Sequence, residues 1–289
     1  MTAEPLGDVR LAVIGAGAMG EAMVSGLVDR RLIEASRVTC SHPRAERRDA
    51  LAAAHGVAVT ADNAAAARDA DIVLLAVKPQ MLPGVLTEMR GTLRPEQLVI
   101  SIIAGASTIA LRDGLQHPAV VRSMPNTPAQ IGKGVTVWYA TTDVDERGRE
   151  RVRAVLGALG REFEVHEERQ VAMATAVSGT GPTYIFLFIE ALTDAAVHLG
   201  FPRHVARELV LDTMSGSAEF ALQSGKHVAE LRDMVTSPGG TSAEALYELE
   251  KGRLRTVVSD AVWAAFERTL QLEARLEGKD ADTEPRRRR

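Results

Sequence analysis

The sequence predicts an α/β protein in two parts: an N-terminal domain with a mostly parallel sheet, and an all-α C-terminal domain. Three observations support this prediction. Up to about residue 165, apolar strand-like runs alternate with Ala-rich helical patterns, the order typical of βαβ units. Beyond that point helical periodicity continues, and no segment alternates with period two. The first strand also leads directly into a Gly-rich turn.

The expected elements follow in order along the chain. Strands are expected at 9–14, 37–41, 57–60, 71–77, 98–103, 119–123, 134–140 and 161–165. Helices are expected between them at 18–30, 43–54, 79–90 and 145–158. Residues 71–77 are apolar at nearly every position, which indicates a strand whose two faces are both covered by helices. The second part is expected to form helices at 182–199, 203–223, 227–235, 242–251 and 253–276.

These patterns divide the chain into residues 1–165, residues 166–277 and a polar tail over 278–289 that ends in four arginines. We expect the tail to be disordered and solvated, with a nucleic-acid contact as the alternative. The stretch 183–200 approaches the length of a membrane span. Glu190, Asp194 and His198 interrupt it along one helical stripe, which favours a helix buried within or between subunits.

Composition narrows the class of protein. Of 289 residues, 46% are hydrophobic and 25% charged, with a formal net charge of −4, so nothing indicates nucleic acid or an anionic membrane as a partner. The single cysteine, Cys40, excludes an intramolecular disulfide and favours a reducing compartment. The first ten residues lack a secretory h-region. We therefore expect a cytoplasmic protein without nucleic-acid or membrane partners, and no metal site.

The Gly-rich turn predicts a dinucleotide site in a Rossmann-type domain. It consists of Gly15, Ala16, Gly17, Ala18, Met19 and Gly20. The motif alone is weak, but here it follows a strand and opens a helix, which is the context that supports it. Gly15 permits a tight turn, Gly17 a close approach of the backbone to pyrophosphate, and Gly20 close packing of helix on strand. The start of the helix supplies free N–H groups to the phosphates.

The end of the second strand predicts which cofactor binds. Enzymes that use NAD usually have a carboxylate here that accepts hydrogen bonds from the ribose 2′-OH. This chain has Ser41 and Arg44 instead, followed by Arg47 and Arg48. Because an arginine fork matches a phosphate, NADPH is expected to be preferred, with NADH possible. The alternative is that Arg44 and Arg47 only form a solvated helix face.

Other loops carry candidate binding groups. Ligands of open α/β sheets bind beyond the carboxyl ends of the strands. Two further strand ends are therefore candidates for binding the cofactor, Ala76-Val77-Lys78 and Ala104-Gly105. Lys78 could equally be solvated, and the MPNTP stretch at 124–128 could be turn chemistry alone. In the second part, the Gly-rich start of a helix at Pro238, Gly239, Gly240, Thr241 and Ser242 could receive a carboxylate. Thr241 with Glu244 also fits a simple capping box.

From Val9 to Leu272 the chain resembles the pyrroline-5-carboxylate reductases, which make L-proline in the last step of its biosynthesis. The resemblance rests on GAGAMG at 15–20, VKP at 77–79, MPNTP at 124–128, VSGTGP at 177–182 and LRDMVTSPGGTSAEAL at 231–246. The last motif is specific to that family, whereas the first is shared with many dehydrogenases.

The resemblance implies a helical domain that intertwines with a partner copy in a homodimer, with decamers as a further assembly. By motif match it implies that Asn63 and Lys78, with the Ala104-Gly105 turn, help to hold NADPH. It places the substrate carboxylate on the loop from Pro238 to Ser242, and Thr175 near the imine nitrogen. Some relatives have Thr at the position of Ser242, which leaves open whether Thr241 or Ser242 contacts substrate.

The expected chemistry fits these residue types. A protonated cyclic imine is already electrophilic, so hydride attack yields an amine without an obligatory acid, and orientation is the main task. A β-hydroxyacid dehydrogenase would need a proton-transfer group, commonly a lysine early in the second part, but residues 182–225 contain none. The remaining alternatives are an imine reductase acting on another carboxylated cyclic imine, and a non-catalytic NADPH-binding protein.

Overall fold

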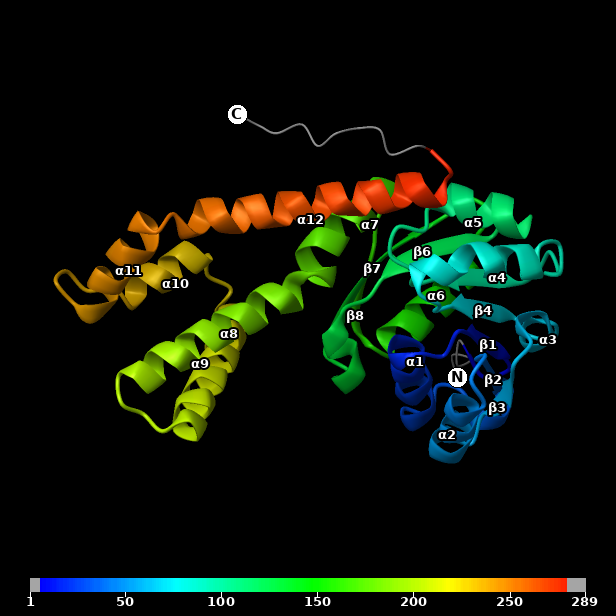
Figure 1. Cartoon of the computed structure of the whole chain (residues 1–289), viewed down its shortest axis with the longest axis horizontal. Helices are drawn as coiled ribbons and strands as arrows, with labels where there is room; N and C mark the ends of the chain where they lie inside the picture. Colours follow the sequence, from blue (N-terminus) through cyan, green and yellow to red (C-terminus); the bar gives the residue numbers. More distant parts are fainter. Residues whose placement is uncertain (1–5, 280–289) are drawn as a thin grey trace. The chain divides into compact units, whose positions relative to one another are not determined.

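The structure, a computed structural model, describes residues 6–279. Each expected strand is present, with bounds close to those expected, and all eight form one sheet in the order β3-β2-β1-β4-β5-β6-β7-β8 (Figure 1). The strands are β1 (Leu11–Ile14), β2 (Val38–Ser41), β3 (Ala58–Thr60), β4 (Ile72–Leu75), β5 (Leu98–Ser101), β6 (Val120–Met124), β7 (Gly134–Ala140) and β8 (Gly160–Glu164). Only the β6–β7 pair is antiparallel, which confirms the mostly parallel Rossmann-type sheet.

Helices cover both faces of this sheet. Along β1, Leu11 and Val13 belong to one buried cluster and Ala12 and Ile14 to the other, because successive strand residues point to opposite faces. The first cluster takes side chains from α1 (Ala18–Asp29), α2 (Ala45–His55) and α6 (Glu146–Gly157). The second takes them from α3 (Asn63–Ala67), α4 (Leu82–Met89) and α5 (Thr108–Leu115). This double cover explains why the central strands are apolar throughout.

Three of the helices were not expected from periodicity: α3, α5 and α7 (Glu168–Ala174). Each spans eight residues or fewer, too few turns for a clear apolar stripe. Local capping supports all three, since Asp62 accepts from the N–H of Ala65, Ser107 from that of Ala110, and Gln170 from that of Glu167. A π-helical turn, η4 (Thr175–Gly179), joins α7 to the next helix.

The chain forms two compact units, Met1–Thr180 with Ala264–Arg289, and Gly181–Trp263. The second unit is entirely helical, as expected. Its helices are α8 (Gly181–His198), α9 (Arg203–Ser224), α10 (Val228–Met234), α11 (Thr241–Lys251) and the first part of α12 (Leu254–Leu276). The domain boundary predicted after residue 165 stays a prediction, because compactness does not define a functional domain. Most of the predicted tail, residues 280–289, lies outside the described residues.

The second unit leaves large apolar side chains in solvent. Phe186, Leu187 and Tyr247 are 59%, 65% and 64% exposed. Within the described residues, one helical run, Glu168–His198, has the length and apolar composition of a membrane span, but only 17% of its most apolar window is buried. Length and composition are weak evidence for a span, and an exposed apolar face equally fits a protein interface.

Candidate functional site

The Gly-rich turn joins the end of β1 to the start of α1. Gly15 has a φ of 82°, and a Cβ added there would lie 2.9 Å from the Cα of Val77, just beyond β4. The N–H groups of Gly15 and Ala16 donate to the carbonyl of Ser41, at 3.0 and 3.1 Å. These two N–H groups are therefore used within the protein, and they fix the turn against the end of β2.

The N–H groups that remain open belong to the first turn of α1. Gly17 is the N-cap of α1 and provides no side chain to cap it. Among residues 6–279, no acceptor makes a hydrogen bond with the N–H groups of Ala18, Met19 and Gly20. A Cβ on Gly17 would find its nearest neighbour 3.8 Å away, so this face of the turn is open. Open N–H groups at the positive end of a helix suit a phosphate.

The end of β2 carries a polar network. Ser41 is fully buried, and its hydroxyl donates to Oδ1 of Asn63 at 2.6 Å. Asn63 in turn donates from its backbone N–H and from Nδ2 to the carboxylate of Glu88, at 3.0 and 2.7 Å. The structure thus brings the predicted residues Ser41 and Asn63 together beside the turn. Their polar groups hold each other, and Glu88, which sequence reasoning missed, orients Asn63.

The arginines after β2 have different roles. Arg44 is exposed at the N-cap of α2, and within the described residues no acceptor binds its guanidinium. Arg47 donates to the carbonyl of Ala16 at 3.2 Å and to Glu21 at 2.7 Å, so it braces the turn. Arg48 donates to two carbonyls of the loop that precedes α2, those of His42 and Pro43. Arg44 is thus the cation of the three that is available to a ligand.

Two ionisable groups near the turn are fixed in one state. Burial disfavours ionisation of Glu21, but the hydrogen bond and charge of Arg47, together with His55, outweigh it and lower the pKa of Glu21. Glu21 therefore stays ionised and keeps its pair with Arg47 at neutral pH. Burial raises the pKa of the Cys40 thiol to about 12. That thiol is a packing group in β2 and no nucleophile.

The remaining predicted cofactor residues lie beyond β4 and β5. Ala76 and Val77 are partly buried, and Lys78 is exposed with no described partner for its ammonium group. Gly105 has a φ of 77°, and a Cβ there would lie 2.8 Å from the Cβ of Leu272 in α12. Packing against α12 therefore requires a glycine at this position, independently of any contact with the cofactor.

Thr175 begins the π-helical turn that follows α7. It is 8% exposed, and its hydroxyl donates to the carbonyl of Val171 at 2.8 Å. Its own carbonyl accepts from the backbone N–H and the hydroxyl of Thr180, at 2.8 and 2.9 Å. A hydroxyl has one proton and two lone pairs. Because the proton is used internally, the oxygen of Thr175 can offer only a lone pair to a ligand.

The start of α11 lies in the second unit. Gly240 is its N-cap and Thr241 its first residue, and no side chain caps the helix. The capping-box interpretation of Thr241 with Glu244 is therefore wrong, since Thr241 lies one position too late. In the described part of the chain no acceptor binds the N–H groups or hydroxyls of Thr241 and Ser242. Open donors at a helix N-terminus are what a carboxylate needs.

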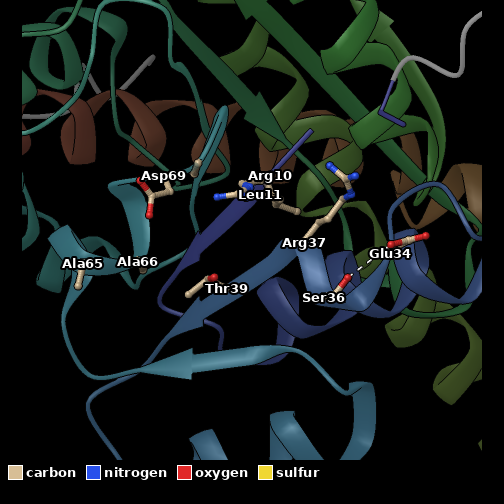
Figure 2. Close-up of a pocket in the computed structure, with 10 residues that line it drawn as sticks. Arg10, Leu11, Glu34, Ser36, Arg37, Thr39, Ala65, Ala66 and Asp69 are labelled. Carbon is tan, nitrogen blue, oxygen red and sulfur yellow. Dashed lines mark hydrogen bonds between the residues drawn. The ribbon is translucent and has the colours of Figure 1, made fainter. Parts of the chain in front are cut away.

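A groove of about 460 Å³ lies on the first unit, away from the Gly-rich turn. Figure 2 shows its lining, which includes Arg10, Arg37, Thr39 and Asp69. Arg10 and Leu11 lie where β1 begins, whereas the dinucleotide turn follows its end. Because ligands of open α/β sheets bind at the carboxyl edge, this groove at the amino edge is not the cofactor site. It contains none of the predicted site residues.

Sequence reasoning missed a buried ion cluster on β6. Arg122 is 3% exposed and pairs with Glu168 of α7 and with Glu273 of α12. A charged residue within a buried strand, VVRSM, was the available signal, because arginine is almost never fully buried without a partner. In residues 6–279 no group of three or more His, Cys, Asp or Glu side chains is arranged to hold a metal ion.

Comparison with known proteins gives consistent results along the chain. Residues 168–272 match the family model described as pyrroline-5-carboxylate reductase dimerisation, and residues 10–105 match that described as NADP oxidoreductase, coenzyme F420-dependent. The chain is 40% identical over 266 residues to pyrroline-5-carboxylate reductase of Synechocystis, covering 92% of this chain and 98% of the relative. It is 39% identical over 268 residues to that of Pseudomonas aeruginosa, with the same coverage.

Solved structures agree with the sequence relatives. The chain is similar to Plasmodium falciparum pyrroline carboxylate reductase with NADP bound, with a TM-score of 0.85 and 32% identity, covering 92% of this chain and 98% of that one. It is also similar to a pyrroline-5-carboxylate reductase from Coxiella burnetii, with a TM-score of 0.84 and 35% identity, covering 91% and 98%.

Proposed function

The chain belongs to the pyrroline-5-carboxylate reductase family, and from that premise we propose how its residues reduce L-1-pyrroline-5-carboxylate to L-proline. The family resemblance expected from the motifs is thereby confirmed, as are the enzyme class and the dependence on a nicotinamide dinucleotide. The overall reaction joins the imine carboxylate, NADPH and two protons to give zwitterionic proline and NADP⁺. The roles assigned below to individual residues are our proposal. We also propose that residues 1–165 form the cofactor-binding domain.

The cofactor residues fit a dinucleotide. The open N–H groups of Ala18 and Met19 receive the pyrophosphate, and Gly17 leaves room for it. Ser41 and Asn63 form the polar wall beside the ribose, and Arg44 provides the exposed cation for a 2′-phosphate. Val77, Lys78 and the Ala104-Gly105 turn complete the carboxyl edge. When bound, NADPH supplies the hydride that reduces the imine carbon.

The substrate carboxylate binds at the start of α11. The observation that supports this function best is the uncapped helix start from Gly240 to Ser242, with open N–H groups and hydroxyls. A Gly-rich dinucleotide turn occurs in many oxidoreductases and does not identify the substrate. The start of α11 is a second anion-binding site, and it favours a substrate that carries a carboxylate. Both Thr241 and Ser242 have an open hydroxyl, so either can add a hydrogen bond.

Thr175 orients the imine nitrogen as a hydrogen-bond acceptor. Its proton is already donated to the carbonyl of Val171, so its oxygen can accept from an N–H but cannot donate. A protonated iminium has one N–H, whereas a neutral imine has none. Thr175 therefore selects the protonated, electrophilic form of the substrate and holds its ring in one orientation. After hydride addition the nitrogen is an amine, which takes its second proton from water.

The activity is tested by following NADPH consumption with L-1-pyrroline-5-carboxylate and identifying proline as the product. A panel of ring imines with and without the carboxylate separates this substrate from other cyclic imines. A protein that binds NADPH but consumes none with any imine of the panel would be the non-catalytic alternative, and the proposal would fail.

Removing the exposed cation should change cofactor choice. In Arg44→Ala, KM for NADPH is expected to rise about tenfold or more while KM for NADH stays unchanged, because a charge-assisted hydrogen bond is worth about 1.5–3 kcal/mol. In Arg47→Ala, which loosens the turn, both constants should rise together. Steady-state kinetics with both cofactors measure this. If KM for NADPH and KM for NADH rose equally in Arg44→Ala, Arg44 would not recognise the 2′-phosphate.

Crowding the start of α11 should weaken substrate binding alone. A Cβ on Gly240 would lie 2.5 Å from the hydroxyl and 3.1 Å from the carbonyl of Ser237. Gly240→Val is expected to raise KM for the imine about tenfold, with KM for NADPH unchanged, since overpacking costs about 1–3 kcal/mol. Gly157→Val, at a helical glycine with open space around it, is the control. If KM for the imine and KM for NADPH were both unchanged in Gly240→Val, the substrate carboxylate would not bind at the start of α11.

The matched dimerisation region makes the protein an oligomer. We propose a homodimer in which the exposed apolar side chains of α8 and α9 are covered by the second copy, with decamers as the larger assembly. We also propose a cytoplasmic location and no membrane insertion of the Glu168–His198 run, because Glu190 and Asp194 lie within it. Light scattering of the purified protein without detergent measures both the assembly and its solubility.

A further inference from the structure

Arg122 is the middle residue of β6, and its side chain is almost fully buried, at 3% exposure. Its Nη1 is 3.0 Å from Oε1 of Glu168, on α7. Its Nη2 is hydrogen-bonded to Oε1 of Glu273, on α12. One guanidinium thus joins three elements that are remote in sequence, with Arg122 and Glu273 being 151 residues apart. α7 packs against β6, and the C-terminal end of α12 lies beside α5 in Figure 1.

The Glu168 carboxylate and the chain end that carries Glu273 both contact the turn after β5. Glu168 accepts from the N–H and the hydroxyl of Thr108, at 2.7 and 2.5 Å. Four residues after Glu273, Glu277 of the same chain end accepts from the hydroxyl of Ser107 at 2.6 Å. Leu272 packs where a Cβ on Gly105 would lie 2.8 Å away. The Ala104–Thr108 segment is therefore contacted by α7 and by the end of α12 with the residue that follows it.

Glu168 also fixes the segment that carries Thr175. It is the first residue of α7, and Thr175 follows the last residue of that helix. A helix is stiff over two turns, so the position of its first residue sets the position of its end. The Arg122 cluster thus connects the cofactor turn to the hydroxyl that faces the imine nitrogen.

We propose that Arg122 is a positioning residue that sets the cofactor turn and Thr175 relative to each other. This inference rests on the proposed function for the roles of Gly105 and Thr175. A guanidinium suits the task because its planar fork binds two carboxylates with fixed geometry, whereas an ammonium is a point charge on a flexible stem. Arg122 itself touches neither cofactor nor substrate.

The two arms predict different kinetic effects. Glu273→Gln loosens only α12 against Gly105, so the Kd for NADPH should rise about tenfold while kcat at saturating NADPH stays within about twofold of wild type. Glu168→Gln loosens the turn and α7 together. The Kd for NADPH should therefore rise, and kcat should fall about tenfold. Arg122→Lys should lie between wild type and Arg122→Met in both measurements. The Gln variants retain side-chain volume and a hydrogen-bonding oxygen, so they remain testable if Arg122→Met fails to fold.

The experiment measures NADPH binding by fluorescence without substrate, then kcat and thermal unfolding, for the whole chain. Arg153→Met is the control, because Arg153 pairs with Glu146 and Glu164 in the same unit but contacts no site segment. Lower melting temperatures in Glu168→Gln and Glu273→Gln with wild-type Kd and kcat would make the cluster purely structural and overturn the proposal. Equal effects of the two Gln variants on kcat would also contradict it. A wild-type protein that binds NADPH but reduces no imine would instead defeat the proposed function, while the Kd comparison would still test the cluster.

Discussion

Gly17→Ala is expected to weaken NADPH binding by about 5- to 150-fold without lowering the melting temperature. In the unliganded protein a Cβ at this position meets nothing closer than 3.8 Å, so the fold accepts alanine. The methyl group would occupy the space above the open N–H groups of Ala18 and Met19, where pyrophosphate must approach. Overpacking of this kind costs about 1–3 kcal/mol, which converts to that range in Kd. Calorimetric titration with NADPH measures it.

Two further glycines separate this effect from damage to the fold. Gly84→Ala, on α4 with nothing within 4 Å of the added Cβ, should bind NADPH normally. Gly15→Ala should lose stability as well as affinity, because its φ of 82° and its contact with Val77 both exclude a side chain. If Gly17→Ala bound NADPH as tightly as Gly84→Ala does, the cofactor phosphates would not lie on this turn.

Thr175→Ala is expected to lower kcat about 10- to 100-fold with little change in the KM for NADPH. The loss follows from removing the one hydrogen-bond acceptor proposed for the iminium nitrogen, since a positioned polar group commonly contributes about that much or more. The fold should tolerate the change, because the carbonyl of Val171 still accepts from the backbone N–H of residue 175. Single-turnover kinetics at saturating NADPH measure the chemical step directly.

Thr175→Ser provides the matched control. Serine keeps the oxygen and can keep its donation to Val171, so kcat should stay within a few-fold of wild type. The acceptor role also predicts a pH effect: Thr175→Ala should lose more activity at low pH, where the substrate is protonated, than at high pH. Wild-type kcat in Thr175→Ala, or equal losses in the alanine and serine variants, would exclude this hydroxyl from the mechanism.

Local patterns in the sequence determined the fold class and the position of the cofactor turn. The strands β1 and β4 formed from contiguous apolar runs, and the Gly15–Gly20 spacing specifies a strand-turn-helix within a few residues. Short elements escaped this reasoning. The helices α3, α5 and α7 are too brief to show a period, and the mistaken capping box at Thr241 came from placing a helix start one residue late.

Only the tertiary structure decided which polar groups are free to act. Ser41, Arg44 and Arg47 look equally available in the sequence, yet Ser41 is held by Asn63 and Arg47 by Glu21, which leaves Arg44 open. The pairing of Arg122 with Glu273 also could not be predicted from the sequence. The physical reason is the same in each case: the glycine and strand patterns act between near neighbours in the chain, whereas a buried charge is satisfied by any partner that the fold brings within reach, at whatever distance in sequence.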